Sequence, residues 1–185
     1  MAWKFWKKNR KLSDADIRAG DSTRYLYKGE IPKDPQEAYD KAVALLKEAG
    51  YQLKKKPGLI KSGMDFTTTL SKTIWLAGNW DEYSLESKAK ILWHELVHTR
   101  QRQAWGFAKY ALRYKSAEGR WRMEAPAYRE SIRAMKAIGK GASDKAVRSW
   151  ISSKIDSMRQ DYKLTALDAG QYRRETQKIW MREVA

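Results

Sequence analysis

The chain has 185 residues, of which 42% are hydrophobic and nine are Trp, enough for one domain with a sizeable core and too apolar for a wholly disordered protein. It contains no Cys, which excludes disulfides, thiolate metal sites and cysteine nucleophiles. The net charge of +16 suits an acidic partner such as nucleic acid, an anionic membrane surface or an acidic protein, although solvated outer faces of helices account for it more simply.

The first eleven residues, MAWKFWKKNRK, combine five positive charges with three aromatic rings. Such a segment can anchor at an interface or dock onto a larger assembly, and it can also be a tail whose rings pack on the body. We expect residues 1–20 to form a basic, aromatic N-terminal arm and residues 21–185 to form the folded domain. The arm lacks the apolar stretch of a secretory signal, and no apolar run in the sequence is long enough to span a bilayer.

The elements predicted after this arm are one helix, a small sheet and then several helices. The first helix is expected at 35–49, with Asp34 as N-cap and Pro35 at the first helical position. Residues 51–80 have β-type composition, with strands expected at 51–53, 66–70 and 73–76, the last two paired, and a basic turn at 54–58. From Ser84 onward the pattern is helical, with helices expected at 85–104, 105–115, 123–138, 144–160 and 168–183 and breaks at Gly119, at Gly139 and Gly141, and around Gly170. This order indicates the α+β fold class.

The only two histidines lie four residues apart in His94-Glu95-Leu96-Val97-His98. Two histidines placed at random would land at this spacing in about 1% of cases, and the following Glu makes chance less adequate still. Residues i and i+4 of a helix share one face, so both imidazoles can reach one ion. Glu95 lies about 100° further around the helix, which keeps it out of the ligand set and beside the ion, where it can hold a water.

The motif lies in an apolar helix segment, which predicts that it is buried. Buried imidazoles and a buried carboxylate need partners, because unpaired polar groups in a core cost several kcal/mol. A metal ion would supply them. The alternative is two core histidines bonded to backbone carbonyls, with Glu95 paired to a nearby Arg.

Catalytic zinc sites usually have three protein ligands and one open position. With no third His and no Cys in the chain, the third ligand is expected to be a later carboxylate. We favour Glu124, because Pro126 suits a first helical turn and would place Glu124 at the start of a helix that small residues allow to approach closely. Glu118, in an expected loop near Gly119, and Glu130, about 240° further around the same helix, remain alternatives.

HELVHTRQ at 94–101, followed by EAPAY at 124–128, resembles the gluzincin type of HExxH zinc metallopeptidase and is similar to small metallopeptidase-like proteins of bacteria and their phages. The resemblance covers roughly residues 73–130. It implies a zincin-like metallopeptidase domain over 21–185, a zinc ion (Zn2+) held by His94, His98 and Glu124, and Glu95 as general base. It also implies that strand 73–76 is an edge strand that binds an extended peptide substrate by β-augmentation.

The chain lacks a further His that could stabilise an oxyanion, so we expect Tyr128 or a nearby Arg to donate to it. Gln101, one turn beyond His98, could support the metal ligands or be solvated. The alternative function is a structural or assembly protein, for example of a phage particle, that docks through its basic surface and residues 1–11. A nucleic-acid-associated protein is a third possibility. The expected location is cytoplasmic or virion-associated.

Overall fold

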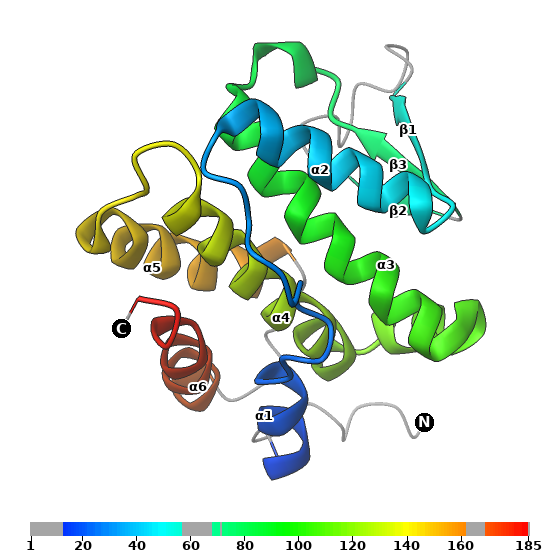
Figure 1. Cartoon of the computed structure of the whole chain (residues 1–185). Coiled ribbons are helices and arrows are strands. Elements are labelled where there is room, and N and C mark those ends of the chain that lie inside the picture. Colours follow the sequence, from blue (N-terminus) through cyan, green and yellow to red (C-terminus); the bar gives the residue numbers. More distant parts are fainter. Residues whose placement is uncertain (1–12, 57–67, 71, 162–168, 185) are drawn as a thin grey trace.

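A computed structural model describes residues 13–56, 68–70, 72–161 and 169–184. Its elements are listed here in chain order: α1 Asp14–Gly20, α2 Pro35–Glu48, β1 Gln52–Lys55, β2 Thr68–Leu70, β3 Thr73–Leu76, the 3-10 turn η1 Trp80–Glu82, α3 Leu85–Tyr114, α4 Ala117–Ala137, α5 Asp144–Asp161 and α6 Ala169–Met181. The α+β class predicted from the sequence is confirmed. In Figure 1, α3 and α4 occupy the middle of the molecule, with the sheet and α2 on one side and α5 and α6 on the other. None of the described helices is both long enough and apolar enough to cross a membrane.

The sheet has the strand order β1-β3-β2, with β1 parallel and β2 antiparallel to β3. The expected pairing of the second and third strands is therefore confirmed. The expectation that 73–76 is an edge strand is wrong, because β3 is hydrogen-bonded on both sides. Lys54 and Lys55 extend β1 rather than forming a turn, since they pair with Trp75 and Leu76.

Helix α2 begins where the sequence predicts. Asp34 accepts a hydrogen bond from the Glu37 amide at 2.9 Å, and Pro35 occupies the first turn. The helix ends one residue early, and Gly50 turns the chain toward β1 with a φ of 81°, which favours glycine. One face of α2 and the inner face of β3 pack against the first half of α3 in a core that includes Leu46, Ile74 and Trp93.

Helix α3 begins at the predicted N-cap, where the Ser84 hydroxyl accepts from the Ser87 amide at 3.2 Å. Its 30 residues are interrupted at Gly106, whose φ of 72° and ψ of 163° are not helical. The predicted boundary between helices 85–104 and 105–115 corresponds to this kink. Glycine is the residue that adopts such a backbone conformation at little cost.

Helix α4 corrects a prediction, because it begins at Ala117 rather than at residue 123. Ser116 caps it by accepting from the Gly119 amide at 2.9 Å, so Gly119 lies in the first turn and not at a break. Pro126 therefore lies inside the helix, although it has no N–H to donate to the carbonyl one turn earlier. The helix tolerates this because 13 of its 21 residues are buried, so its packing offsets the lost hydrogen bond.

A second core joins α4 to α5 and α6, and its largest fully buried members include Trp121, Tyr172 and Trp180. α5 spans 144–161 against a prediction of 144–160, and α6 spans 169–181 against 168–183, with Gly170 inside its first turn. Residues 14–20 of the expected N-terminal arm form α1, which contacts α4 and α6. Residues 1–12 lie outside the described part of the chain.

Candidate metal centre

The site lies between α3 and α4, which pack against each other. α3 presents His94 and His98 one turn apart, and α4 presents Glu124 opposite them. The two Nε2 atoms lie 3.1 Å apart, and Glu124 Oε2 lies 3.4 Å from His94 Nε2 and 3.6 Å from His98 Nε2. Three ligand atoms that converge in this way can hold a metal ion. The structure thus brings together the three residues that the sequence analysis chose as ligands.

Because they are largely buried, His94, His98 and Glu124 carry a desolvation cost that a bound ion would offset. The side chains of Glu124 and His98 are 4% and 7% exposed, and His94 is slightly more open at 12%. Glu124 Oε2 is a buried atom with no hydrogen-bond partner among the described residues. A buried carboxylate oxygen in that state is costly unless a cation or a donor compensates it. A cation at the point where the three ligand atoms converge would remove this cost.

In the metal-free protein, His98 and Glu124 shift each other's pKa values. Burial by itself lowers the pKa of His98, but Glu124, with smaller contributions from Glu95 and Gln101, raises it from 6.5 to about 9. Burial by itself raises the pKa of Glu124, but the charge of His98 and the close nitrogens of both histidines hold it well below its usual range. The His98 contribution to stability is therefore full below pH 6.5 and is lost as the pH rises through about 9. The Glu124 contribution is present above pH 4.5 and is lost as the pH falls below that value.

Side chains behind the ligands orient the two imidazoles. Gln101 is fully buried, and its Oε1 lies 3.1 Å from His98 Nδ1 while its Nε2 donates to the Met123 carbonyl at 2.9 Å. Because an amide oxygen only accepts, His98 Nδ1 carries a proton, and Nε2 is left as the nitrogen that binds a metal ion once its own proton is released. Gln101 is therefore a supporting residue and not a solvated one. Ser131 Oγ lies 3.4 Å from His94 Nδ1, a contact that the sequence analysis missed.

The two alternative carboxylates have other partners. Glu118 pairs with Arg122 one turn away at 2.6 Å, in the first part of α4 rather than in a loop. Glu130 is fully buried, pairs with Arg133 at 2.8 Å and accepts from the Tyr27 amide at 3.2 Å. Neither belongs to the group around the two histidines. The histidine ring nitrogens contact side chains of Glu124, Gln101 and Ser131, which differs from the alternative of core histidines bonded to backbone carbonyls.

Glu95 is 4% exposed and lies near enough to His98 for its charge to raise the pKa of that residue. The Tyr128 ring meets the His94 ring edge-on, with centroids 4.6 Å apart, so this tyrosine adjoins the site while most of it is buried. Tyr110 was not foreseen. Burial raises its pKa, and the charges of Glu124 and Glu95 raise it further.

The turn at Gly106 explains why Tyr110 lies within electrostatic reach of the site. In a straight helix Tyr110 would lie about 18 Å along the axis from His98. The kink redirects the second part of α3 instead. The glycine was visible in the sequence as a break, but the direction of the bend depends on packing. Tyr110 remains neutral at ordinary pH and is a possible hydrogen-bond donor.

Comparison with known proteins yields no relative, because no protein-family model, no curated protein and no solved structure matches the chain. The family suggested by HELVHTRQ and EAPAY therefore stays a prediction. The functional proposal rests on the geometry of the site.

Proposed function

We propose that the chain is a zinc-dependent metallopeptidase that hydrolyses peptide bonds, with His94, His98 and Glu124 as ligands and Glu95 as general base. The observation that carries the proposal is the convergence of ligand atoms from His94, His98 and Glu124, near the buried carboxylate of Glu95. Four ligands placed tetrahedrally at 2.0–2.1 Å from zinc are separated by about 3.3 Å. The separations here are 3.1, 3.4 and 3.6 Å, so the donor set fits this ion with little adjustment.

The choice of zinc also follows from the chemistry of the donors. Two imidazoles and one carboxylate are a ligand set of catalytic zinc sites, which leave the fourth position for water or substrate. Sites for Mg2+ or Ca2+ use oxygen ligands instead. The orientation of His98 by Gln101 follows the usual support of a zinc ligand by a hydrogen bond to its other ring nitrogen.

The proposed reaction assigns distinct tasks to the side chains of this chain. A zinc ion bound at the site supplies Lewis acidity toward the scissile carbonyl and toward water. Glu95 accepts the proton of the attacking water and delivers it to the leaving amine. Tyr128, whose ring adjoins His94, and Tyr110 are the proposed donors to the oxyanion that develops on the substrate.

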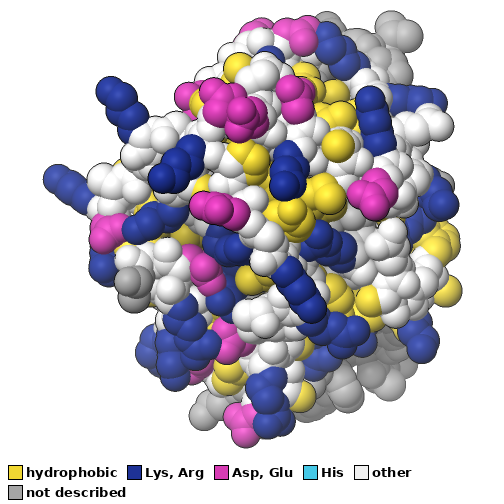
Figure 2. All heavy atoms as spheres, viewed as in Figure 1, with side chains coloured by type: hydrophobic (Ala, Val, Ile, Leu, Met, Phe, Trp, Pro, Cys, Tyr) yellow, Lys and Arg dark blue, Asp and Glu magenta, His cyan; other side chains and the backbone are white. Residues whose placement is uncertain are grey.

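A structural or assembly role is the second candidate, because the charge is high and widely distributed. Figure 2 shows Lys and Arg scattered across the visible face, with Asp and Glu interspersed and no single basic patch. Such a surface would suit general attraction to an acidic partner more than a compact recognition site. In this role the metal would be structural, and Glu95 would be dispensable.

Metal analysis and hydrolysis together test the proposal. Purified wild type, His98→Ala and Glu124→Ala are analysed for metal content by mass spectrometry, with Glu118→Ala as the control for a lost acid on the same helix. We expect one zinc per chain in the wild type and in the control, and loss of zinc in the two ligand variants. A folded wild type that refuses added zinc would refute the proposal.

The Glu95→Gln variant separates an enzyme from a scaffold. It preserves the size of the side chain but cannot accept the proton, so we expect it to retain zinc and to lose at least about 100-fold in hydrolysis of a protein substrate such as casein. Equal hydrolysis by Glu95→Gln and wild type would contradict the role of Glu95. Absence of any hydrolysis by zinc-loaded wild type would favour the structural role.

A further inference from the structure

Two lysines flank the aromatic side of the metal centre. Lys90 lies one turn before His94 on α3, and Lys154 comes from α5. The Lys154 Nζ lies 5.5 Å from the centroid of the Tyr128 ring, which itself meets the His94 ring. The Lys90 Nζ lies 5.9 Å from the centroid of the Trp150 ring, which in turn packs on Tyr128. Lys154 therefore lies over the ring that contacts the proposed zinc ligand His94, and Lys90 lies over the next ring of the same stack.

The positive charges of this pair are not neutralised within the described part of the chain, where neither lysine forms an ion pair with a carboxylate. Both side chains are half-buried. Burial lowers the pKa of Lys90, and the charge of Lys154 lowers it further, which places the two ammonium groups within electrostatic reach of each other. Like charges near each other on partly desolvated side chains repel, and an anion bound between them would relieve this repulsion.

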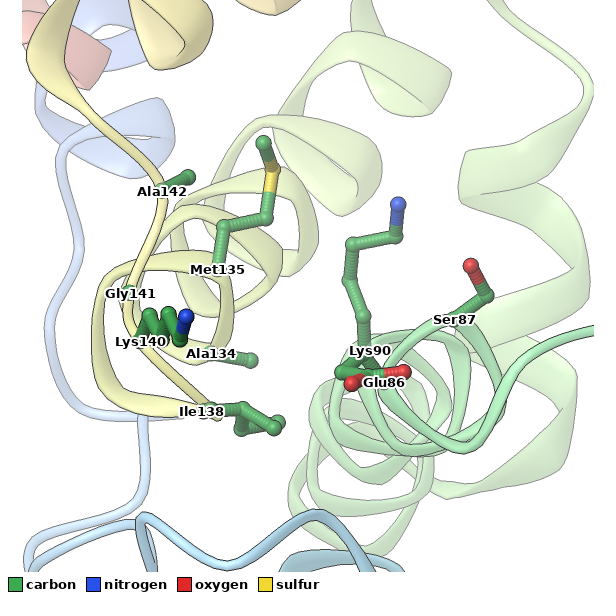
Figure 3. A pocket seen from close by; sticks show the side chains of 10 residues that line it. Glu86, Ser87, Lys90, Ala134, Met135, Ile138, Lys140, Gly141 and Ala142 are labelled. Carbon is green, nitrogen blue, oxygen red and sulfur yellow. The ribbon is translucent and has the colours of Figure 1, made fainter.

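A cavity adjoins Lys90 on the side away from His94. It has a volume of about 230 Å³ and is lined by the first turns of α3, the end of α4 and the loop to α5. Figure 3 shows Lys90 on α3 and Met135 on α4 on opposite sides of this cavity, with both side chains extending in the same direction. Small-molecule sites usually measure about 300–1,000 Å³, so a cavity of this size suits one residue of a longer substrate.

The cavity and the metal centre both lie along the contact between α3 and α4. Along α3, Lys90 and His94 are separated by one helical turn, and along α4, Tyr128 and Met135 are separated by two. A substrate chain bound at the metal centre and extending toward the start of α3 would therefore meet the two lysines first and the cavity next. The step from His94 to Lys90 along the helix is about 6 Å, close to the length of two residues of an extended peptide.

We propose that Lys90 and Lys154 bind a carboxylate of the substrate beside the scissile bond, so that the preferred substrates are peptides with an acidic residue or a free C-terminal carboxylate at this position. The inference deepens the proposed function and rests on it, because the metal centre defines where the peptide lies. Lysine ammonium groups beside aromatic rings provide charge-assisted hydrogen bonds to a carboxylate without being fixed by an internal acid.

Binding is measured first, so that the test does not depend on turnover. The probes are a nine-residue alanine peptide blocked at both ends with one central Glu, the same peptide with Gln, and the Gln peptide with a free C-terminal carboxylate. Each is titrated by calorimetry into Glu95→Gln protein, both zinc-loaded and metal-free. We expect at least one carboxylate peptide to bind about tenfold more tightly than the blocked Gln peptide. Whichever carboxylate binds tighter identifies its source as a side chain or a chain terminus.

Substitutions assign the effect to the two lysines. Lys90→Gln and Lys154→Gln in the same background should each remove about tenfold of the preference for the carboxylate peptide, and Lys→Arg at either position should restore it in part. Lys145→Gln is the matched control, since it removes an exposed charge from α5 more than two turns from Lys154. Equal binding of all three peptides, or a preference unchanged in folded Lys90→Gln and Lys154→Gln proteins, would overturn the inference.

Hydrolysis of the same peptides by zinc-loaded wild type separates this inference from the proposed function. Equal cleavage of charged and neutral peptides, together with equal binding, leaves the peptidase proposal intact and refutes the carboxylate site. Selective binding without any cleavage supports the carboxylate site and refutes the peptidase proposal.

Discussion

Replacing Gln101 by Ala should weaken zinc binding although none of the proposed zinc ligands is changed. The amide of Gln101 links His98 Nδ1, at 3.1 Å, to the Met123 carbonyl, at 2.9 Å, and the side chain is fully buried. Its removal leaves two buried polar groups without a partner and allows the His98 ring to rotate. We expect about 2–4 kcal/mol less stability in the metal-free protein, from two lost buried hydrogen bonds. We expect zinc affinity to fall by about 10- to 100-fold, as for other residues that orient a zinc ligand.

The two effects are measured separately. Urea unfolding of metal-free protein gives the stability change, and competition with a fluorescent zinc chelator gives the affinity. Gln103→Ala is the matched control, because Gln103 is on the same helix but exposed, and it should change neither quantity. A Gln101→Ala protein that binds zinc within twofold of wild type would refute the reasoning that Gln101 holds His98 in its metal-binding orientation.

Three further predictions concern the pH dependence of stability, the backbone at Gly106 and the buried ion pairs of Arg129. Metal-free protein should lose about 3 kcal/mol of stability between pH 6.5 and 9, from a His98 pKa raised to about 9, and urea unfolding of His98→Ala should be nearly flat over this range. Gly106→Ala should cost about 1–3 kcal/mol in urea unfolding, because a φ of 72° strains any residue with a Cβ. The added Cβ meets no atom within 4 Å, so the cost comes from the backbone alone, and a neutral result would show that the kink relaxes. Arg129→Met should cost about 3 kcal/mol in thermal unfolding, because the buried guanidinium pairs with Asp21 and Glu183; a loss below about 1 kcal/mol would contradict this.

The sequence by itself determined the features that depend on neighbours within a few residues. Asp34 and Ser84 cap helices because a short polar side chain can reach the amide three residues ahead. The spacing of His94 and His98 places both imidazoles on one face of any helix that contains them. The expected α+β order followed from the change in composition between residues 51 and 84. These are consequences of local geometry, which tertiary packing did not override.

The predicted place of Glu124 beside the two histidines is confirmed, although the argument for it was partly wrong. Glu124 was favoured because Pro126 was taken to mark a first helical turn, yet the helix begins at Ala117 and the proline lies inside it. What places Glu124 at the histidines is the packing of α4 on α3. Packing also decides that Glu130, on the same helix, pairs with Arg133 instead. Their angular separation of about 240° around the helix indicated that Glu124 and Glu130 do not both face the histidines, but it left open which of the two does.

Only the tertiary structure decided what surrounds the candidate metal centre. Tyr110 lies within electrostatic reach of it because Gly106 bends α3, and Lys154 of α5, 60 residues beyond His94, lies over the adjoining Tyr128 ring. β3 is central rather than at an edge because β1 and β2 pair on both of its sides. Each of these facts depends on how separate helices and strands pack together. The free energy of that packing comes from apolar burial summed over many residues. This packing free energy cannot be read from any short segment of the sequence. The ligands could therefore be proposed from the sequence, but their surroundings could not.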